Sequence, residues 1–223
     1  MTSTGKQSNR RLWAAIFVAS ILVVGATVVV SGVLGGAQKM SAIAFHDAMR
    51  KLWEDHTTWT RLAIVSLVAD LPDTDATVGR LIQNQEDIGN AIRPFYGDPA
   101  GDGLTALLKD HIAVAAEIVL AAKAGNQVGV EDAKARWYAN GEEIAAFLSS
   151  ANPKSWSPEM MRQMMHDHLD LTFQEAVAQL TGDFAGSVAT YDAVHAQILQ
   201  MADMLSAGII QQFPQLFNGP VPR

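Results

Sequence analysis

An Asp-His pair occurs three times in this chain, and a second polar pattern follows each occurrence. About thirty residues after each histidine comes an amide side chain, followed three positions later by a carboxylate. The Asp-His pairs are Asp55-His56, Asp110-His111 and Asp167-His168. The later pairs are Asn84 with Asp87, Asn140 with Glu143, and Gln200 with Asp203. This recurrence predicts one structural unit that the chain uses three times.

Histidines and carboxylates that converge inside a helical bundle are the usual ligands of metal sites there. The pattern therefore predicts a site built from His56, Asp87, His111, Glu143, His168 and Asp203. Iron, zinc, manganese and copper(II) accept this mixture of imidazole and carboxylate ligands. Hydrogen-bond partners around such ligands are expected from Asn84, Asn140, Asp192 and His195.

Two other interpretations of the same residues stay open. Buried histidine–carboxylate pairs also form hydrogen-bond networks that only hold helices together, and a pocket for a small molecule is a further possibility. The chain has no paired Glu-x-x-His and no His-Glu-x-x-His sequence, which are the signatures of known metal sites on helices. No residue is singled out as catalytic, and a binding or structural role is favoured over an enzyme.

Helices must position these side chains, because apolar residues recur with a period of 3.6 from Ser41 onward. Turn residues divide this region into six predicted helices, near 41–70, 75–92, 104–124, 130–149, 158–180 and from about 183 to 212. The glycine- and proline-rich stretch after residue 92 and the stretch 151–158 are expected to be loops. The predicted fold is all-α: a six-helix up-and-down bundle of three hairpins, preceded by one transmembrane helix.

Each histidine lies in an apolar stripe, so its side chain is expected to face the core. In an antiparallel hairpin, equal distances from the turn give equal heights, at 1.5 Å per residue. His56 and Asp87 lie 16 and 15 residues from Pro72, and the second pair is similarly balanced around Asn126. The third pair fails this test, because Asp203 is about 7 residues, or roughly 10 Å, too far along.

The N-terminal region predicts a membrane anchor. Residues 1–11 form a basic tail, and residues 12–34 carry no charge over a length that suffices to cross a bilayer. We expect an anchor at 12–36, a cytoplasmic N-terminus, an extracytoplasmic bundle at 41–217 and a disordered tail at 218–223. A signal sequence that is cleaved before Gln38 is the alternative.

Composition excludes several classes of function. The formal net charge is −7, and no basic run with interleaved aromatic residues occurs, so nucleic acid is not an expected partner. The chain has no cysteine, which excludes disulfides and thiol chemistry. Arg61 is the expected counter-ion of a buried carboxylate, either Glu117 or Glu175.

Several segments together resemble a family of uncharacterised bacterial helical proteins. They are LWEDHTTWTR, QNQEDIGNAI with RPFYG, KDHI, WYANGEEIAAFLSSANP, HDHLDLT, and YDAVH through MADMLSAGIIQQFP. The resemblance covers roughly residues 45–217 and leaves the apolar N-terminal segment outside. It implies an all-helical domain and carries no implied activity.

Overall fold

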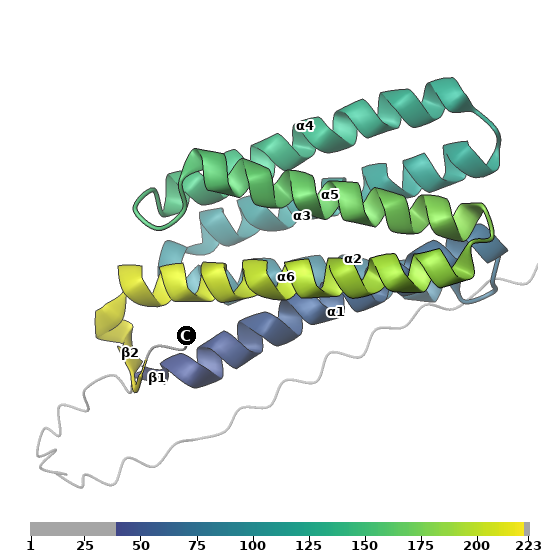
Figure 1. Ribbon diagram of the computed structural model, residues 1–223. Coiled ribbons are helices and arrows are strands. Elements are labelled where there is room, and N and C mark those ends of the chain that lie inside the picture. The colour runs from purple at the N-terminus through teal and green to yellow at the C-terminus, as the bar shows by residue number, and fades with distance from the viewer. Residues whose placement is uncertain (1–38, 221–223) are drawn as a thin grey trace, which may run out of the picture. The chain divides into compact units, whose positions relative to one another are not determined.

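The computed structural model describes residues 39–220, which contain six α-helices (Figure 1). The helices are α1 (Ala42–Ala69), α2 (Thr74–Tyr96), α3 (Asp98–Lys123), α4 (Gln127–Ala151), α5 (Pro158–Leu180) and α6 (Phe184–Gln212). The prediction of an all-α bundle of six helices is confirmed. The predicted transmembrane segment lies outside the described residues, and within them no helix is both long and apolar enough to cross a membrane.

Local capping explains where most helices begin. The side chains of Ser41, Asn126, Ser157 and Asp183 each accept a hydrogen bond from the backbone N–H three residues ahead, at the starts of α1, α4, α5 and α6. Such caps satisfy a backbone donor that the helix itself leaves unpaired. Proline follows Ser157 at the first helical position of α5, where its fixed φ favours a helix.

The expected loop between the second and third helices is much shorter than predicted. Pro94 lies inside α2 rather than after its end, and α3 begins at Asp98, so Gly97 alone separates the two helices. Gly97 has a φ of 82°, which breaks the helix, and Pro99 sits in the first turn of α3, where a missing N–H costs nothing. Gly101 and Gly103 of the expected loop are instead part of the α3 helix.

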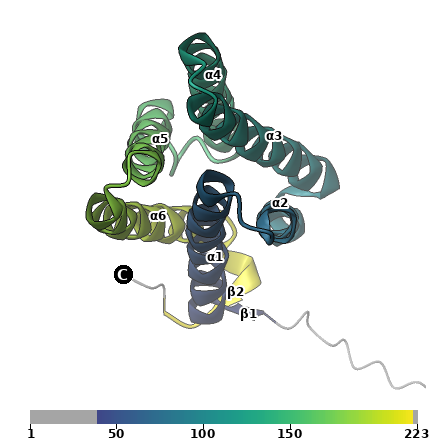
Figure 2. The same ribbon diagram turned by 90° about the vertical axis from the view of Figure 1, so that its right-hand side faces the viewer.

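The six helices form a closed ring in chain order, since each packs against its sequence neighbours and α6 packs against α1 (Figure 2). The odd-numbered helices α1, α3 and α5 also contact one another, so they form the centre of the bundle. Because consecutive helices run in opposite directions, the three central helices run parallel to one another. The three tight turns therefore lie together at one end, which faces the viewer in Figure 2.

The opposite end is closed by a short pairing of the chain's two described ends. Strand β1 (Met40–Ser41) lies parallel to β2 (Phe217–Asn218), and a 3₁₀ turn at Pro214–Leu216 leads into β2. Phe217 stacks near Phe45 and Phe95 there. Asn218 is thus ordered in this pairing, although the sequence suggested a disordered tail from that position; residues 221–223 lie outside the described part.

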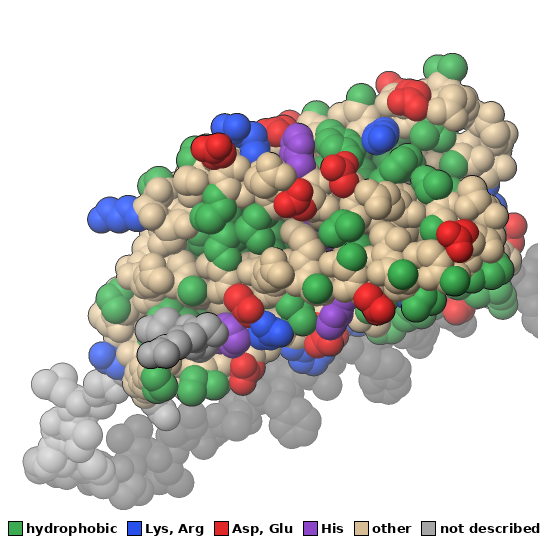
Figure 3. All heavy atoms as spheres, viewed as in Figure 1, with side chains coloured by type: hydrophobic (Ala, Val, Ile, Leu, Met, Phe, Trp, Pro, Cys, Tyr) green, Lys and Arg blue, Asp and Glu red, His purple; other side chains and the backbone are tan. Residues whose placement is uncertain are grey.

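Apolar side chains fill the interior, and charged side chains of both signs are interspersed on the face shown in Figure 3. One ion pair is an exception. Glu175 is 1% exposed, and Arg61 donates to its Oε1 at 2.8 Å and to the hydroxyl and carbonyl of Ser187. This confirms one of the two partners expected for Arg61 and ties α1 to α5 and α6.

A pair of glycines sets the close approach of α2 and α3. A Cβ on Gly89 would overlap the hydroxyl of Thr105 and lie 2.7 Å from the carbonyl oxygen of Gly101. A Cβ on Gly101 would lie 2.9 Å from the carbonyl oxygen of Gly89. The backbones of the two helices therefore meet where only glycine fits.

We expect Gly89→Ala to lower the free energy of unfolding by about 1–3 kcal/mol, because the methyl group forces the two helices apart. Gly79→Ala on the same helix is the matched control, since a Cβ there meets nothing within 4 Å. That variant should gain about 0.5–1 kcal/mol from higher helix propensity. Urea unfolding of both variants measures the two changes in free energy of unfolding. Equal changes would show that the close contact of α2 and α3 does not restrict position 89 to glycine.

Candidate functional site

The three histidines of the repeated pattern meet at the centre of the bundle. His56, His111 and His168 come from α1, α3 and α5, and each is 3% exposed. The ring centroid of His168 lies 5.7 Å from that of His56 and 6.4 Å from that of His111. The prediction that these side chains face inward at one level is confirmed. We call this set the histidine layer.

An amide side chain from the following helix holds each imidazole. In the second hairpin, His111 Nδ1 lies 2.9 Å from Oδ1 of Asn140, and the amide nitrogen of Asn140 donates to the carbonyl of Leu107 at 3.1 Å. The third hairpin repeats this with His168 and Gln197, at 3.2 Å, and again the amide nitrogen donates to the carbonyl four residues before the histidine. One amide thus bridges an imidazole and the backbone of the same helix.

Two residues share these tasks in the first hairpin. Asn84 donates to the carbonyl of Leu52, which is again four residues before the histidine. Gln85 lies 3.3 Å from His56 Nδ1 and donates to the carbonyl of Leu81. Both amides are 0% exposed. The first unit therefore keeps the bridge but divides it between neighbouring side chains.

The spacing from imidazole to amide is constant, at 29 residues in all three hairpins. Asn140 contacts its histidine, whereas the expected Asn84 contacts the Leu52 carbonyl, and the amide at His56 is Gln85, which was not expected from the sequence. Gln197 was missed, because the third copy was aligned on Gln200 and Asp203, one helical turn too far. The comparison of heights places Asp203 about 7 residues beyond the level of His168, unless the turn between the last two helices is longer than predicted. A search for amides at a fixed interval from each histidine would have found Gln197.

The expected carboxylate ligands do not face the histidines, so this part of the predicted site is wrong. Asp87 pairs with Arg80 at 3.5 Å, Glu143 is exposed, and Asp203 pairs with Arg50 at 2.6 Å. The physical reason is desolvation. An ionised carboxylate in this dry core would require a paired charge, whereas an amide satisfies a neutral imidazole without any net charge.

The remaining predicted partners lie at the surface. His195 Nε2 is 3.0 Å from Oε1 of Glu54, with about a third of the histidine side chain exposed, and Asp192 is exposed. Neither residue contacts the histidine layer. In the described part of the chain, no three His, Asp or Glu side chains are grouped closely enough to hold a metal ion. The predicted set of six ligands is therefore not assembled.

Burial keeps the histidine layer uncharged. Desolvation, followed by repulsion from His168, lowers the pKa of His111 to about 3. Desolvation lowers the pKa of His168 to about 4. The pKa of His56 is also lowered, by desolvation first and then by the two neighbouring imidazoles. The amide hydrogen bonds act in the opposite direction but do not prevail, so all three rings are neutral at neutral pH.

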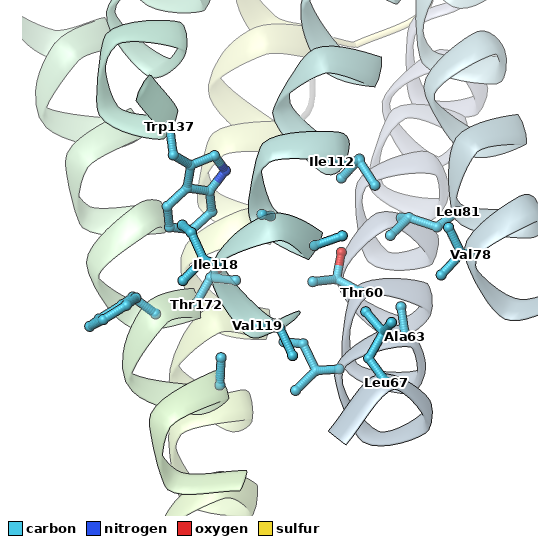
Figure 4. A pocket seen from close by; sticks show the side chains of 15 residues that line it. Thr60, Ala63, Leu67, Val78, Leu81, Ile112, Ile118, Val119, Trp137 and Thr172 are labelled. Carbon is cyan, nitrogen blue, oxygen red and sulfur yellow. The ribbon is translucent and has the colours of Figure 1, made fainter. Parts of the chain in front are cut away.

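A cavity of about 50 Å³ lies one helical turn beyond the histidine layer, towards the three tight turns (Figure 4). Thr60 and Thr172, each four residues after a histidine, line it together with Trp137 and mainly aliphatic side chains. The hydroxyl of Thr60 donates to the carbonyl of His56 at 2.7 Å. Among the described residues, the hydroxyl of Thr172 and the indole N–H of Trp137 are buried without a hydrogen-bond partner.

Trp137 links this cavity to the histidine layer. Its ring stacks on His111, with centroids 5.1 Å apart and an angle of 30° between the planes. On the other side of the layer, a second space of only about 10 Å³ is lined by Trp53, Met165 and the histidines themselves. That space is at the lower limit for a single water molecule. The cavity beside Trp137 is larger, at about a third of the roughly 150 Å³ of an apolar cavity that holds benzene, so it has room for one end of a ligand.

Comparison of the chain with family models, with curated proteins and with solved structures found no match. The resemblance noted from the sequence segments stays a prediction.

The neutral histidine layer predicts steep acid unfolding. An unfolded histidine binds a proton near pH 6.5, but the buried imidazoles do not until the pH is far lower, so protons favour the unfolded chain. The stability is fully present above pH 6.5 and is lost as the pH falls towards the folded pKa values of about 3 and 4. Near pH 5, the free energy of unfolding should therefore change by about 4 kcal/mol per pH unit, because three such histidines contribute to it.

Urea unfolding between pH 8 and pH 4.5 measures this slope. His111→Gln should reduce it by about a third, because one buried imidazole is removed. His166→Gln is the control, since His166 lies outside the layer, against Glu142 at 2.6 Å, and this variant should keep the steep dependence. A slope below 1 kcal/mol per unit in the unsubstituted chain would contradict a neutral layer.

Proposed function

We propose that this chain is a non-catalytic binding protein whose bundle takes a small, mostly apolar ligand in the cavity beside the histidine layer. The observation that carries the proposal is the pair of buried, unpartnered polar groups on the cavity wall, the hydroxyl of Thr172 and the indole N–H of Trp137. A ligand with one neutral hydrogen-bonding end, such as a hydroxyl or a carbonyl, would satisfy both groups while its chain fills the apolar space.

Packing energetics support this choice. Protein interiors are close-packed, and nearly all buried polar atoms are hydrogen-bonded. Leaving a buried donor unpaired costs roughly 1–3 kcal/mol, so this bundle carries two such costs beside a void. A buried water needs two to four polar partners, and the wall is otherwise almost wholly aliphatic. The two unpartnered groups give a water only the minimum number of partners, whereas the polar end of a small organic ligand would satisfy them and also cover the aliphatic wall.

A divalent metal at the histidine layer is the second candidate. Asn140 and Gln197 present oxygen atoms to Nδ1 of His111 and His168. Because an amide oxygen accepts hydrogen bonds, the hydrogen of each neutral imidazole lies on Nδ1, and Nε2 keeps a free lone pair. Neutral imidazoles of this kind ligate zinc or iron. Titration of the full chain with zinc tests this candidate. Stoichiometric binding that is lost in His111→Ala would favour it, and absence of binding would remove it.

A purely architectural role is the remaining alternative. Asn140 and Gln197 each join their helix to two points on the preceding helix, and Asn84 and Gln85 do so together, which would stabilise the bundle with or without a ligand. In that case, His111→Ala would lower the melting temperature, and no ligand would bind.

We also propose that the apolar N-terminal segment is a membrane anchor. Residues 12–34 would hold the protein in a membrane by a single span, with the bundle outside the cytoplasm. Intact-mass measurement of the mature chain tests this. A mass that corresponds to a chain beginning at Gln38 would mean that the N-terminal segment is a cleaved signal sequence instead.

Straight-chain alcohols are suitable probes for the cavity. We expect hexan-1-ol to bind the full chain and raise its melting temperature, and we expect Thr172→Val to weaken that binding about five- to tenfold, the worth of one hydrogen bond. Without ligand, Thr172→Val should be more stable by about 1 kcal/mol, because it removes an unsatisfied hydroxyl. Calorimetry and urea unfolding measure the two effects.

Thr60→Val is the matched control on the same cavity. Its hydroxyl already donates to the carbonyl of His56, so its loss should lower stability while hexanol affinity changes less than twofold. If calorimetry detects no binding of any straight-chain alcohol from propanol to decanol, the proposed function is contradicted, and water is left as the occupant of the cavity. Equal affinity of the Thr172→Val variant would show that the polar end lies elsewhere.

A further inference from the structure

A groove opens at the end of the bundle where the three tight turns lie. It has a volume of about 740 Å³ and is lined by the last turns of α1, α3 and α5 and by the first turns of α4. Four residues line both this groove and the cavity beside the histidine layer: Ile118, Val119, Phe173 and Ala176. The groove and the cavity therefore share a wall made of these four side chains, and the groove is the side from which solvent lies nearest to the cavity.

Three charged side chains line the groove, and two of them already have partners. Lys123 lies 2.6 Å from Asp70 and also donates to the carbonyl of Leu67. Glu131 accepts a hydrogen bond from Gln127. Lys134 differs, because it takes part in no ion pair among the described residues, and its ammonium lies 4.2 Å from the ring centroid of Phe173. The cation is thus held over the aromatic side chain that lines both spaces.

The position of Lys134 relates it directly to the cavity. Lys134 and Trp137 are three residues apart on α4, so they share a face and are separated by about 4.5 Å along the helix axis. A molecule with a polar group at each end can therefore contact the cavity at Trp137 and the groove at Lys134.

We infer that the ligand is a short linear carboxylate that enters through the groove, places its neutral polar end at Thr172 and Trp137, and pairs its carboxylate with Lys134. This inference rests on the proposed function and adds the class of ligand and its orientation. The aliphatic walls at Ile118 and Val119 then surround the methylene chain.

The charge balance of the groove favours a monoanion. A doubly charged phosphate would have only Lys134 to neutralise it, because the ammonium of Lys123 is committed to Asp70. Glu131 would repel the second charge, and the chain as a whole has a net charge of −7. A carboxylate matches the single available cation and avoids both penalties.

Three six-carbon probes separate the contributions at each end: hexan-1-ol, hexanoate and 6-hydroxyhexanoate. Calorimetry on the full chain at pH 7.5 should give 6-hydroxyhexanoate an affinity about tenfold higher than that of hexanol. Lys134→Gln should remove this advantage and leave hexanol binding unchanged within twofold. Lys154→Gln is the matched control, because Lys154 is exposed in the α4–α5 connection, and it should preserve all three affinities.

The entry path is tested by Ala176→Leu, which places a larger side chain at the junction of groove and cavity. This variant should lose binding of all three probes, whereas Ala146→Leu on the exposed face of α4 should bind normally. Equal affinities for hexanol and 6-hydroxyhexanoate, or an unchanged ratio in Lys134→Gln, would overturn the carboxylate inference while the proposed function stands. Failure of every probe to bind would overturn both.

Discussion

Three imidazoles buried at one level of the bundle are the constraint on which the rest of the structure depends. They remain buried only while they are neutral and hydrogen-bonded, since a charged imidazole in this dry core would be strongly destabilising. The amides at a fixed interval of 29 residues meet this requirement. The same interval sets the register of each hairpin, because an amide one turn away would miss its histidine.

This arrangement explains why the odd-numbered helices are central. Each carries one histidine inward, and each receives an amide from the helix that follows it in the chain. The three hairpins are therefore equivalent units, and the ring closes where α6 packs on α1. Apolar packing alone would allow the helices to slide past one another. The hydrogen bonds between the amides and the backbone fix their relative positions.

Within residues 39–220, two polar groups also lack partners one helical turn beyond the histidine layer, in addition to Gln85 Oε1 and Trp53 Nε1 at the layer itself. The threonine in α1 is satisfied by the carbonyl of His56, whereas the equivalent Thr172 in α5 is not, and the tryptophan beside it is likewise unpaired. Polar atoms left unpaired beside a void oppose stability, and such departures are typical of binding sites. A groove at the surface that shares four wall residues with this cavity agrees with that interpretation.

The sequence by itself determined the helical class, the three hairpins and the inward histidines, because period-3.6 patterning, caps and turn residues act locally. It also indicated Asn140 as the partner of His111, but not Gln85 and Gln197, which meet the other two histidines. Only the tertiary structure decided that amides rather than carboxylates meet the imidazoles, because that choice depends on how dry the centre becomes once six helices close around it. The cavity, the groove and the unpaired Thr172 likewise arise from packing between distant segments, which no local pattern specifies.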